Sequence, residues 1–357
     1  MVTARHDTNT GTGSSREYRY APADVTKDAL GNDRLACCTI RWTLPPLSAA
    51  IARGGAEQRG GRGRSGGMNH PPKYVIVSPV RNEGKHIRNT LESVTRQTVQ
   101  PAEWVVVDDG SRDDTPDIVR EYAKTFPWIR LVERRDRGYA EPGRGVIEAF
   151  YAGYERIGHR DFDFIVKLDG DLTFGERYFE SLFDRFRENP RLGMASGVCY
   201  VEINGGLERE NHPEFHVRGP SKVYRRECWE QIGVLVKHLG WDSLDEIKAQ
   251  YHGWDTRSYK DLVIIHHKVT GKNTGVFRWA IKLGQSDYYC GYHPLFLLAK
   301  GLRRLFLPPY VVGGVGILWG YFGNYLRGAE RFPEEDVVHF LRNEQLKRLT
   351  WRGGIWR

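Results

Sequence analysis

Short apolar segments alternate with helix-forming segments from Lys73 to Leu168, and this alternation constrains the fold more than any other feature of the chain. The apolar segments are residues 74–77, 104–107, 129–132 and 162–168. Asn82 is placed to cap a helix after the first segment, Pro116 suits a first helical turn after the second, and residues 146–157 have helical spacing after the third. The pattern predicts a parallel α/β sheet with right-handed crossovers, in which ligands bind at the carboxyl ends of the strands.

Three polar motifs directly follow the first, second and fourth of these expected strands. They are Ser78-Pro79-Val80-Arg81-Asn82-Glu83, Asp108-Asp109-Gly110-Ser111 and Asp169-Gly170-Asp171. Because the carboxyl ends of parallel strands share one edge of a sheet, we expect the motifs to meet there. Crowded carboxylates repel and raise each other's pKa, and a divalent cation or a ligand with donor groups removes that cost.

The Asp169-Gly170-Asp171 motif predicts a site for Mg²⁺ or Mn²⁺, because such cations usually bind one or two carboxylates together with phosphate oxygens. Asp and Gly are also common in turns, so an isolated copy would more often be a turn. Its place after an apolar strand, with a second acidic motif earlier in the sheet, favours the metal site. Taken alone, Asp108-Asp109-Gly110-Ser111 is a strand-to-helix turn capped by Ser111; its functional interpretation is a clamp on a base and ribose.

In this order the three motifs resemble those of family 2 glycosyltransferases, and the resemblance covers residues 73–290. It implies a GT-A fold, which is a Rossmann-like α/β domain with a mostly parallel central sheet, and a nucleotide-diphosphate sugar as donor. Arg81 departs from the family, which usually has an uncharged residue there. Gly143 belongs to a segment similar to the family's Gly-rich approach to the nucleotide, or it is a simple helix entry. The residues that the resemblance assigns to the nucleotide sugar are Pro79, Asn82, Glu83, Asp108, Asp109, Gly143 and Asp169. The same resemblance assigns Asp169 and Asp171 to the metal.

The acceptor side of the site is also assigned by this resemblance. The family places a Glu-Asp pair before a Gly-aromatic pair, and aligning Gly253-Trp254 with the latter puts Trp241 on the Glu and Asp242 on the catalytic Asp. Asp242 is therefore the expected base, with Gly219, Trp241 and Asp245 on the acceptor side. Asp245 also suits the first turn of a helix, where acidic residues complement the macrodipole.

His266-His267-Lys268 follows the apolar segment 262–265. In some family members a histidine that ends this strand binds the metal or a phosphate, so His267 is expected as a further metal ligand. Either histidine of the pair meets that pattern. A histidine alone is weak evidence for a ligand.

These residues imply an inverting, metal-assisted transfer of a sugar to an acceptor hydroxyl on a glycan or a lipid-linked glycan, as in polysaccharide biosynthesis. A nucleotidyltransferase is the alternative enzyme, but it normally has a Gly-rich loop after the first strand, which residues 78–83 lack. A non-catalytic nucleotide-sugar-binding protein is the other alternative. The presence of Asp169, Asp171 and Asp242 together argues against it.

The net charge of +8 lies at the two ends of the chain. Residues 1–70 have 10 basic and 6 acidic residues, residues 297–357 have 10 and 5, and residues 71–296 have 33 and 34. Nucleic-acid enzymes more often carry this charge around a binding groove, so we expect no nucleic-acid partner. We expect a disordered Gly/Arg-rich tail over 1–70, the GT-A domain over 71–296 and a C-terminal helical extension over 297–357.

The segment from Leu305 to Leu326 runs for 22 residues without a charge. Its length would allow a membrane span, although Pro308, Pro309 and five glycines argue against one straight helix. We rank three interpretations: a peripheral contact with a membrane surface, a packed helical pair, and a span.

The five cysteines are odd in number and lack metal-site spacing, and the N-terminus has no apolar signal segment. Both observations predict a cytoplasmic protein with free thiols. A position at the cytoplasmic face of the membrane is the alternative.

Overall fold

The computed structural model describes residues 25–27, 33–35, 71–136, 138, 143–203, 206–210, 212–268 and 275–350. Of the expected tail over 1–70, these ranges include only β1 (Val25–Lys27) and β2 (Asp33–Leu35), which pair antiparallel. The rest of that tail lies outside the described residues, so its disorder stays a prediction.

A nine-stranded sheet forms the centre of the molecule, in the order β5-β4-β3-β6-β10-β8-β11-β7 with β9 paired to β8. The first four strands in this order are parallel, and β10 is antiparallel to both its neighbours. The strands are β3 (Tyr74–Val80), β4 (Glu103–Asp108), β5 (Ile129–Glu133), β6 (Phe164–Leu168), β7 (Leu172–Phe174), β8 (Leu192–Ile203), β9 (Gly206–Arg209), β10 (Ser221–Arg225) and β11 (Asp255–His266). The parallel α/β sheet expected from the alternating segments is confirmed.

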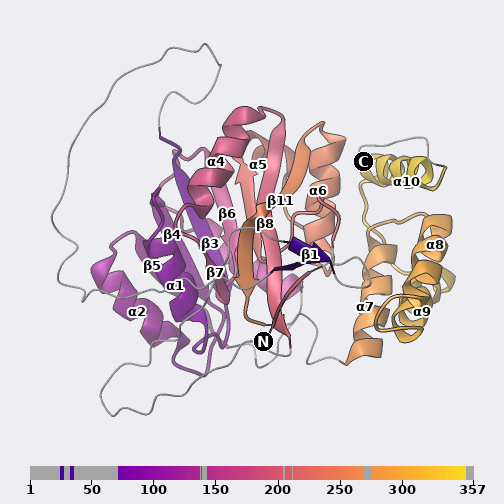
Figure 1. Cartoon of the computed structure of the whole chain (residues 1–357), viewed down its shortest axis with the longest axis horizontal. Helices are drawn as coiled ribbons and strands as arrows, with labels where there is room; N and C mark the ends of the chain where they lie inside the picture. Colours follow the sequence, from indigo (N-terminus) through magenta and orange to yellow (C-terminus); the bar gives the residue numbers. More distant parts are fainter. Residues whose placement is uncertain are drawn as a thin grey trace.

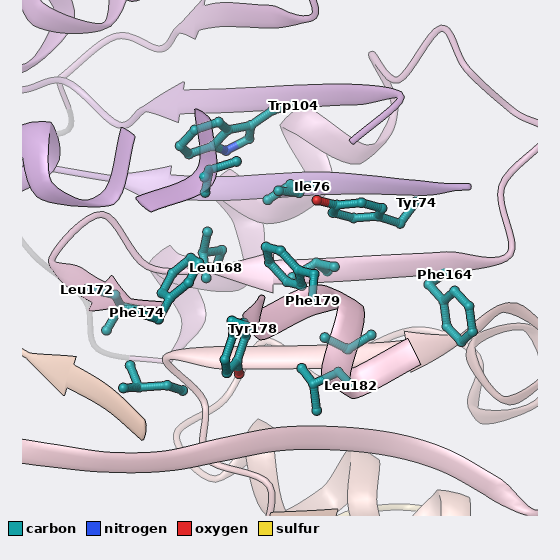
Figure 2. Close-up of a cluster of buried hydrophobic side chains, with 14 of the residues drawn as sticks. Tyr74, Ile76, Trp104, Phe164, Leu168, Leu172, Phe174, Tyr178, Phe179 and Leu182 are labelled. Atoms are coloured by element: carbon teal, nitrogen blue, oxygen red, sulfur yellow. The ribbon is translucent and has the colours of Figure 1, made fainter. Parts of the chain in front are cut away.

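Helices pack on both faces of this sheet (Figure 1). Residues 74 and 76 of β3 contact one core, which includes side chains of α1 (Ile87–Thr95), α2 (Thr115–Thr125) and α4 (Tyr178–Glu188). Figure 2 shows part of this core, where Phe179 of α4 lies over Tyr74 and Ile76.

The opposite face of the sheet has a core of its own. Residues 75 and 77 of β3 contact this second core, with α3 (Arg144–Tyr154), α5 (Arg226–Ile232) and α6 (Trp241–Tyr251). Because successive strand residues point to opposite faces, burial on both faces requires an unbroken apolar run. The runs 74–77 and 104–107 meet this requirement.

Four further helices lie at one end of the molecule, beyond α6 (Figure 1). They are α7 (Val276–Tyr289), α8 (Pro294–Leu305), α9 (Val312–Leu326) and α10 (Glu335–Leu349). The helical part therefore begins at Val276, earlier than the expected boundary at residue 297. Within the described part of the chain, no helix is both long enough and apolar enough to cross a bilayer.

Glycines allow α7 and α9 to pack closely. A Cβ on Gly320 of α9 would lie 2.1 Å from the carbonyl oxygen of Ile281, and a Cβ on Gly284 of α7 would lie 2.1 Å from that of Ile317. Real side chains do not approach a backbone oxygen so closely, so these positions require glycine at this helix spacing.

Helix α6 lies between the sheet and the C-terminal helices. Trp241 and Ala249 contribute to the second sheet core, whereas Leu244 and Ile247 contact Val337 and Leu341 of α10. Lys248 also pairs with Glu334 at 2.8 Å. The C-terminal helices therefore hold the helix whose second residue, Asp242, is the expected catalytic base.

The loop before α6 is held by α7. The Ser286 hydroxyl donates to the Leu239 carbonyl oxygen at 2.9 Å, and the ring of Tyr289 stacks on His238 at 3.7 Å between centroids. Gly240, which precedes α6, has φ 94°, and a Cβ there would lie 2.2 Å from the Ser286 hydroxyl. Glycine at 240 therefore allows both the left-handed turn and the contact with α7.

Candidate active site

The three polar motifs lie at one rim of the sheet, because β4, β3 and β6 are adjacent parallel strands. The backbone N–H of Asn82 donates to the Ser111 hydroxyl at 2.8 Å, and the Asn82 side-chain oxygen accepts from the N–H of Arg112 at 2.8 Å. A Cβ on Gly170 would lie 2.7 Å from Val80, so the third motif packs on the first. The motifs are therefore one connected rim and not separate turns.

Asp108 and Asp109 have different surroundings. The buried carboxylate of Asp108 accepts from the N–H of Ser111 at 3.1 Å, which is the contact of a turn. The carboxylate of Asp109 pairs with Arg134 at 2.7 Å, and the Asp109 carbonyl oxygen accepts from Arg81 at 2.8 Å. The carboxylate of Asp109 is therefore held by a cationic side chain, Arg134, that follows the neighbouring strand β5.

Arg81, which departs from the family pattern, is fixed by Asp136. Its guanidinium lies 2.6 Å from one carboxylate oxygen of Asp136, and Arg112 lies 2.8 Å from the other. The N–H of Gly138 and the two arginines lower the pKa of Asp136 to about 2. This end of the rim therefore carries arginines whose orientation is set before any ligand binds.

Gly143 lies between the expected donor side and the expected acceptor side. It precedes α3 with φ 83°, and a Cβ there would lie 2.6 Å from the backbone nitrogen of Leu239. The expected nucleotide segment is therefore in contact with the loop that leads to Asp242.

Glu83 faces the Asp-Gly-Asp motif. Lys268 pairs with its carboxylate at 2.5 Å. Burial raises the pKa of Glu83 to about 7, and repulsion from Asp171 adds to this effect.

Replacement of Glu83 by Gln is expected to flatten the pH dependence of stability in the ligand-free protein. The folded-state pKa of about 7 lies above the ordinary value of 4.5, so the folded protein loses stability relative to the unfolded chain as pH rises through 7. Between mildly acidic and mildly alkaline pH, the free energy of unfolding of the wild type should fall by about 1–2 kcal/mol more than that of Glu83→Gln. Urea unfolding at both pH values measures this difference. Equal pH slopes in the two proteins would contradict the raised pKa of Glu83.

Asp169 and Asp171 are each accompanied by a buried cationic group. The ammonium of Lys167 donates to Asp169 and, at 2.7 Å, to the carbonyl oxygen of Gly219. Burial raises the pKa of Asp169. Burial also opposes ionisation of Asp171, yet the contact with His266 keeps the pKa of Asp171 below its ordinary value.

Both histidines adjoin the acidic motif: the His267 backbone N–H donates to the Asp171 carbonyl oxygen at 2.9 Å, whereas the His266 side chain faces the Asp171 carboxylate. The Nε2 of His266 lies 3.4 Å from Asp171, and its Nδ1 lies 3.7 Å from Glu210. The ring of His267 instead has its Nε2 2.8 Å from the Thr173 hydroxyl. The side chain that contacts the Asp171 carboxylate is therefore that of His266 and not that of the expected His267. The role of His267 as a metal ligand stays a prediction.

The two carboxylates fit a divalent cation that is shared with phosphate oxygens. Oxygen ligands are those that Mg²⁺ and Mn²⁺ prefer, and Mg²⁺ is usually bound through one or two carboxylates plus substrate phosphates. Within the described residues, no group of three or more His, Cys, Asp or Glu side chains has the arrangement of a complete protein-only site. Asp169 and Asp171 would hold the cation, and the donor would complete its shell.

Asp242 lies in the first turn of α6, facing Gly219. A Cβ on Gly219 would lie 3.4 Å from a carboxylate oxygen of Asp242 and 3.4 Å from the Trp241 ring. Burial opposes ionisation of Asp242, but Lys222, His216, Arg218 and Lys167 lower its pKa. In the part of the chain that the structure describes, no donor forms a hydrogen bond to this carboxylate, so it remains available to accept one.

A buried lysine anchors the start of α6. The ammonium of Lys222, which is fully buried, lies 2.5 Å from the Asp242 carbonyl oxygen, 2.7 Å from Asp245 and 3.3 Å from Glu246. The Tyr224 hydroxyl donates to Asp245 at 2.6 Å, and the pKa of Asp245 is raised to about 7, chiefly by burial. Asp245 is thus a buried counter-ion of Lys222, which differs from the acceptor-side position expected for it.

Sequence reasoning missed Lys167 and Lys222. Their ammonium groups lie 5.4 and 5.3 Å from the Trp241 ring centroid, so this indole is in contact with both cations. For Lys167 the signal was a lysine within the apolar segment 164–168, whereas residues 221–225 are of mixed polarity and gave no such signal for Lys222. A charge in an apolar segment requires a buried partner.

Comparison with known proteins gives a family match. Residues 75–241 match the model described as Glycosyl transferase family 2, and Asp242 follows the last matched residue. Validoxylamine A glucosyltransferase from Streptomyces hygroscopicus subsp. limoneus is 28% identical over 181 residues, covering 50% of this chain and 35% of that protein. Putative glycosyltransferase EpsH from Bacillus subtilis (strain 168) is 35% identical over 173 residues, covering 48% and 46%. The chain thus spans less than half the length of these two relatives.

A solved structure is also similar. Mannosyltransferase PcManGT from Pyrobaculum calidifontis, in complex with GDP-Man and Mn²⁺, is 20% identical, covers 80% of this chain and 77% of that chain, and has a TM-score of 0.47. The family match contains all three rim motifs on the strands described above. Residues 75–241 therefore match glycosyltransferase family 2, and their strands and helices have the mixed α/β arrangement of a GT-A fold.

Proposed function

We propose that the protein is an inverting glycosyltransferase that moves a sugar from a nucleotide-diphosphate sugar to an acceptor hydroxyl. The observation that carries this proposal is the free carboxylate of Asp242 beside Gly219, whose carbonyl oxygen binds the same lysine as Asp169. A proton acceptor and an acidic, metal-competent motif are therefore adjacent at one rim.

The donor would bind along the rim from the arginines to the Asp-Gly-Asp motif. Asp109 and Glu83 offer carboxylates, Asn82 and Asp108 fix the turns, and Pro79, Gly143 and Asp169 complete the set that we propose for the nucleotide sugar. Asp169 and Asp171 would hold Mg²⁺ or Mn²⁺, which when bound neutralises charge on the leaving diphosphate. His267 stays a proposed further metal ligand.

The chain's own part in the reaction is proton transfer and orientation. Asp242 accepts the proton of the acceptor hydroxyl, and Lys222 and Lys167 keep Asp242 and Asp169 in place. The acceptor oxygen then attacks from the face opposite the leaving group, so the anomeric configuration inverts. We propose that Gly219 and Trp241 line the acceptor side. Asp245 supports this side indirectly, as the buried counter-ion of Lys222.

We propose a glycan or lipid-linked glycan as acceptor, and a cytoplasmic protein. Among the described residues, Cys199, Cys228 and Cys290 are free and buried, which suits a reducing compartment.

A panel of nucleotide sugars tests the donor by thermal shift. A ligand that binds only the folded form stabilises it in proportion to the logarithm of its concentration over Kd. We expect one sugar nucleotide to raise the Tm in the presence of Mn²⁺, with much less effect in EDTA, and slow hydrolysis of the same compound. Asp171→Asn should lose the Mn²⁺-dependent part of the shift. A panel in which no sugar nucleotide binds would overturn the proposal.

A further inference from the structure

The end of the bundle formed by α7, α8 and α9 is an exposed apolar surface, which we call the apolar tip. It comes from the start of α7, the turn after α8 and the start of α9. Its main residues are Val276, Phe277, Phe306, Tyr310, Val311 and Val312. Each is at least 42% exposed, and Phe306 is 78% exposed. Isolated apolar residues on a surface are normal, but a contiguous patch marks an interaction site.

Contacts between the helices bring these three segments together. A Cβ on Gly316 of α9 would lie 2.6 Å from Ala280 and 3.2 Å from the carbonyl oxygen of Phe277, so the first turns of α9 and α7 are adjacent. The N–H of Val311 donates to the carbonyl oxygen of Leu305 at 3.0 Å, which holds the turn against the end of α8. The patch is therefore a single surface made by segments far apart in sequence.

The charge around the apolar tip has one sign. Arg278, Arg303 and Arg304 belong to the same segments and are exposed. Between Asp287 and Glu330 the sequence has no acidic residue. Within the ranges that the structure describes, no carboxylate pairs with any of these three arginines.

This charge selects the occupant of the tip. A second copy of the chain in a symmetric contact would bring three arginines against three arginines. A bilayer surface with anionic lipids instead supplies opposite charge for the arginines and an interface into which aromatic side chains insert. We propose that the apolar tip binds the surface of an anionic bilayer, with Phe306 and Tyr310 inserted and Arg303 and Arg304 at the headgroups. This inference does not depend on the sugar that the rim transfers.

Co-sedimentation of the full chain with vesicles tests the electrostatic part. We expect binding to vesicles of equal parts phosphatidylcholine and phosphatidylglycerol, and much weaker binding to phosphatidylcholine alone. Each basic residue near such a surface contributes about fivefold, so R303Q/R304Q should weaken binding about 30-fold. The control R177Q/R187Q removes the same charge from two exposed positions, one just before α4 and one on it, and should bind as the wild type does.

The apolar part is tested by F306S/Y310S, which changes two exposed side chains and leaves the core intact. It should weaken binding about tenfold or more and should abolish the part that survives high salt. An unchanged Tm confirms that the variant is folded. Three results would overturn the proposal: no binding of the wild type to anionic vesicles, wild-type binding by R303Q/R304Q, or a solution dimer that F306S/Y310S dissociates.

Discussion

Asp242→Asn is expected to lower kcat by roughly 10²–10⁴-fold, the usual contribution of a general base. The amide has nearly the same shape and keeps its place between Gly219 and the start of α6, but it does not accept a proton from the acceptor hydroxyl. Binding of the donor nucleotide should be unchanged, because the rim motifs follow strands of the sheet, whereas Asp242 lies on α6. Steady-state kinetics and calorimetric titration of the nucleotide measure the two quantities separately.

A matched substitution tests whether position matters. Asp261→Asn makes the same chemical change at an exposed residue that pairs with Arg185 on the surface. It should leave both kcat and nucleotide binding as in the wild type. Full turnover by Asp242→Asn would place the base elsewhere. Loss of nucleotide binding in that variant would assign Asp242 to the donor.

Lys222→Met is expected to destabilise the protein by about 3–5 kcal/mol, because it leaves buried carboxylates without their cation. Lys222 is fully buried and contacts both Asp245 and Glu246, whereas methionine offers similar length without charge. Urea unfolding at neutral pH measures the change in the free energy of unfolding.

Two further variants separate this effect from simple repacking. The double variant K222M/D245N should recover about half of the lost stability, because the asparagine still accepts the hydrogen bond from Tyr224 and carries no charge. Lys73→Met removes a lysine from an exposed pair with Asp161 and should change little. Equal losses in K222M and K222M/D245N would show that the buried charge is not the cause.

The central sheet could be predicted from the sequence because its strands are buried on both faces. Apolar runs such as residues 74–77 and 104–107 need no partner to be recognised, and parallel strands carry whatever follows them to one rim. The start of the first helix was less predictable. It begins at Ile87 and not beside Asn82, because Asn82 bonds across to Ser111 and Arg112.

The proposed acceptor side was harder to predict because its geometry depends on contacts between distant segments. Strand pairing brings His266 beside Asp171, as β11 ends opposite the start of β7 at Leu172. Lys222 meets Asp245 only when β10 and α6 pack together. The helical boundary at Val276 likewise depends on the contact between α7 and α9, which no local pattern reports.

The contact of α7 with the loop before Asp242 sets the distance between the apolar tip and the candidate active site. One end of this helix is held at His238 and Leu239, and the other end belongs to the apolar tip. A helix of 14 residues is roughly 20 Å long and behaves as a stiff strut. If the tip rests on lipid headgroups, Asp242, the proposed base, stands at a fixed height above them. Acceptors would then be selected by the length of the part that joins the reactive hydroxyl to its lipid, because that part must hold the hydroxyl at the height of Asp242.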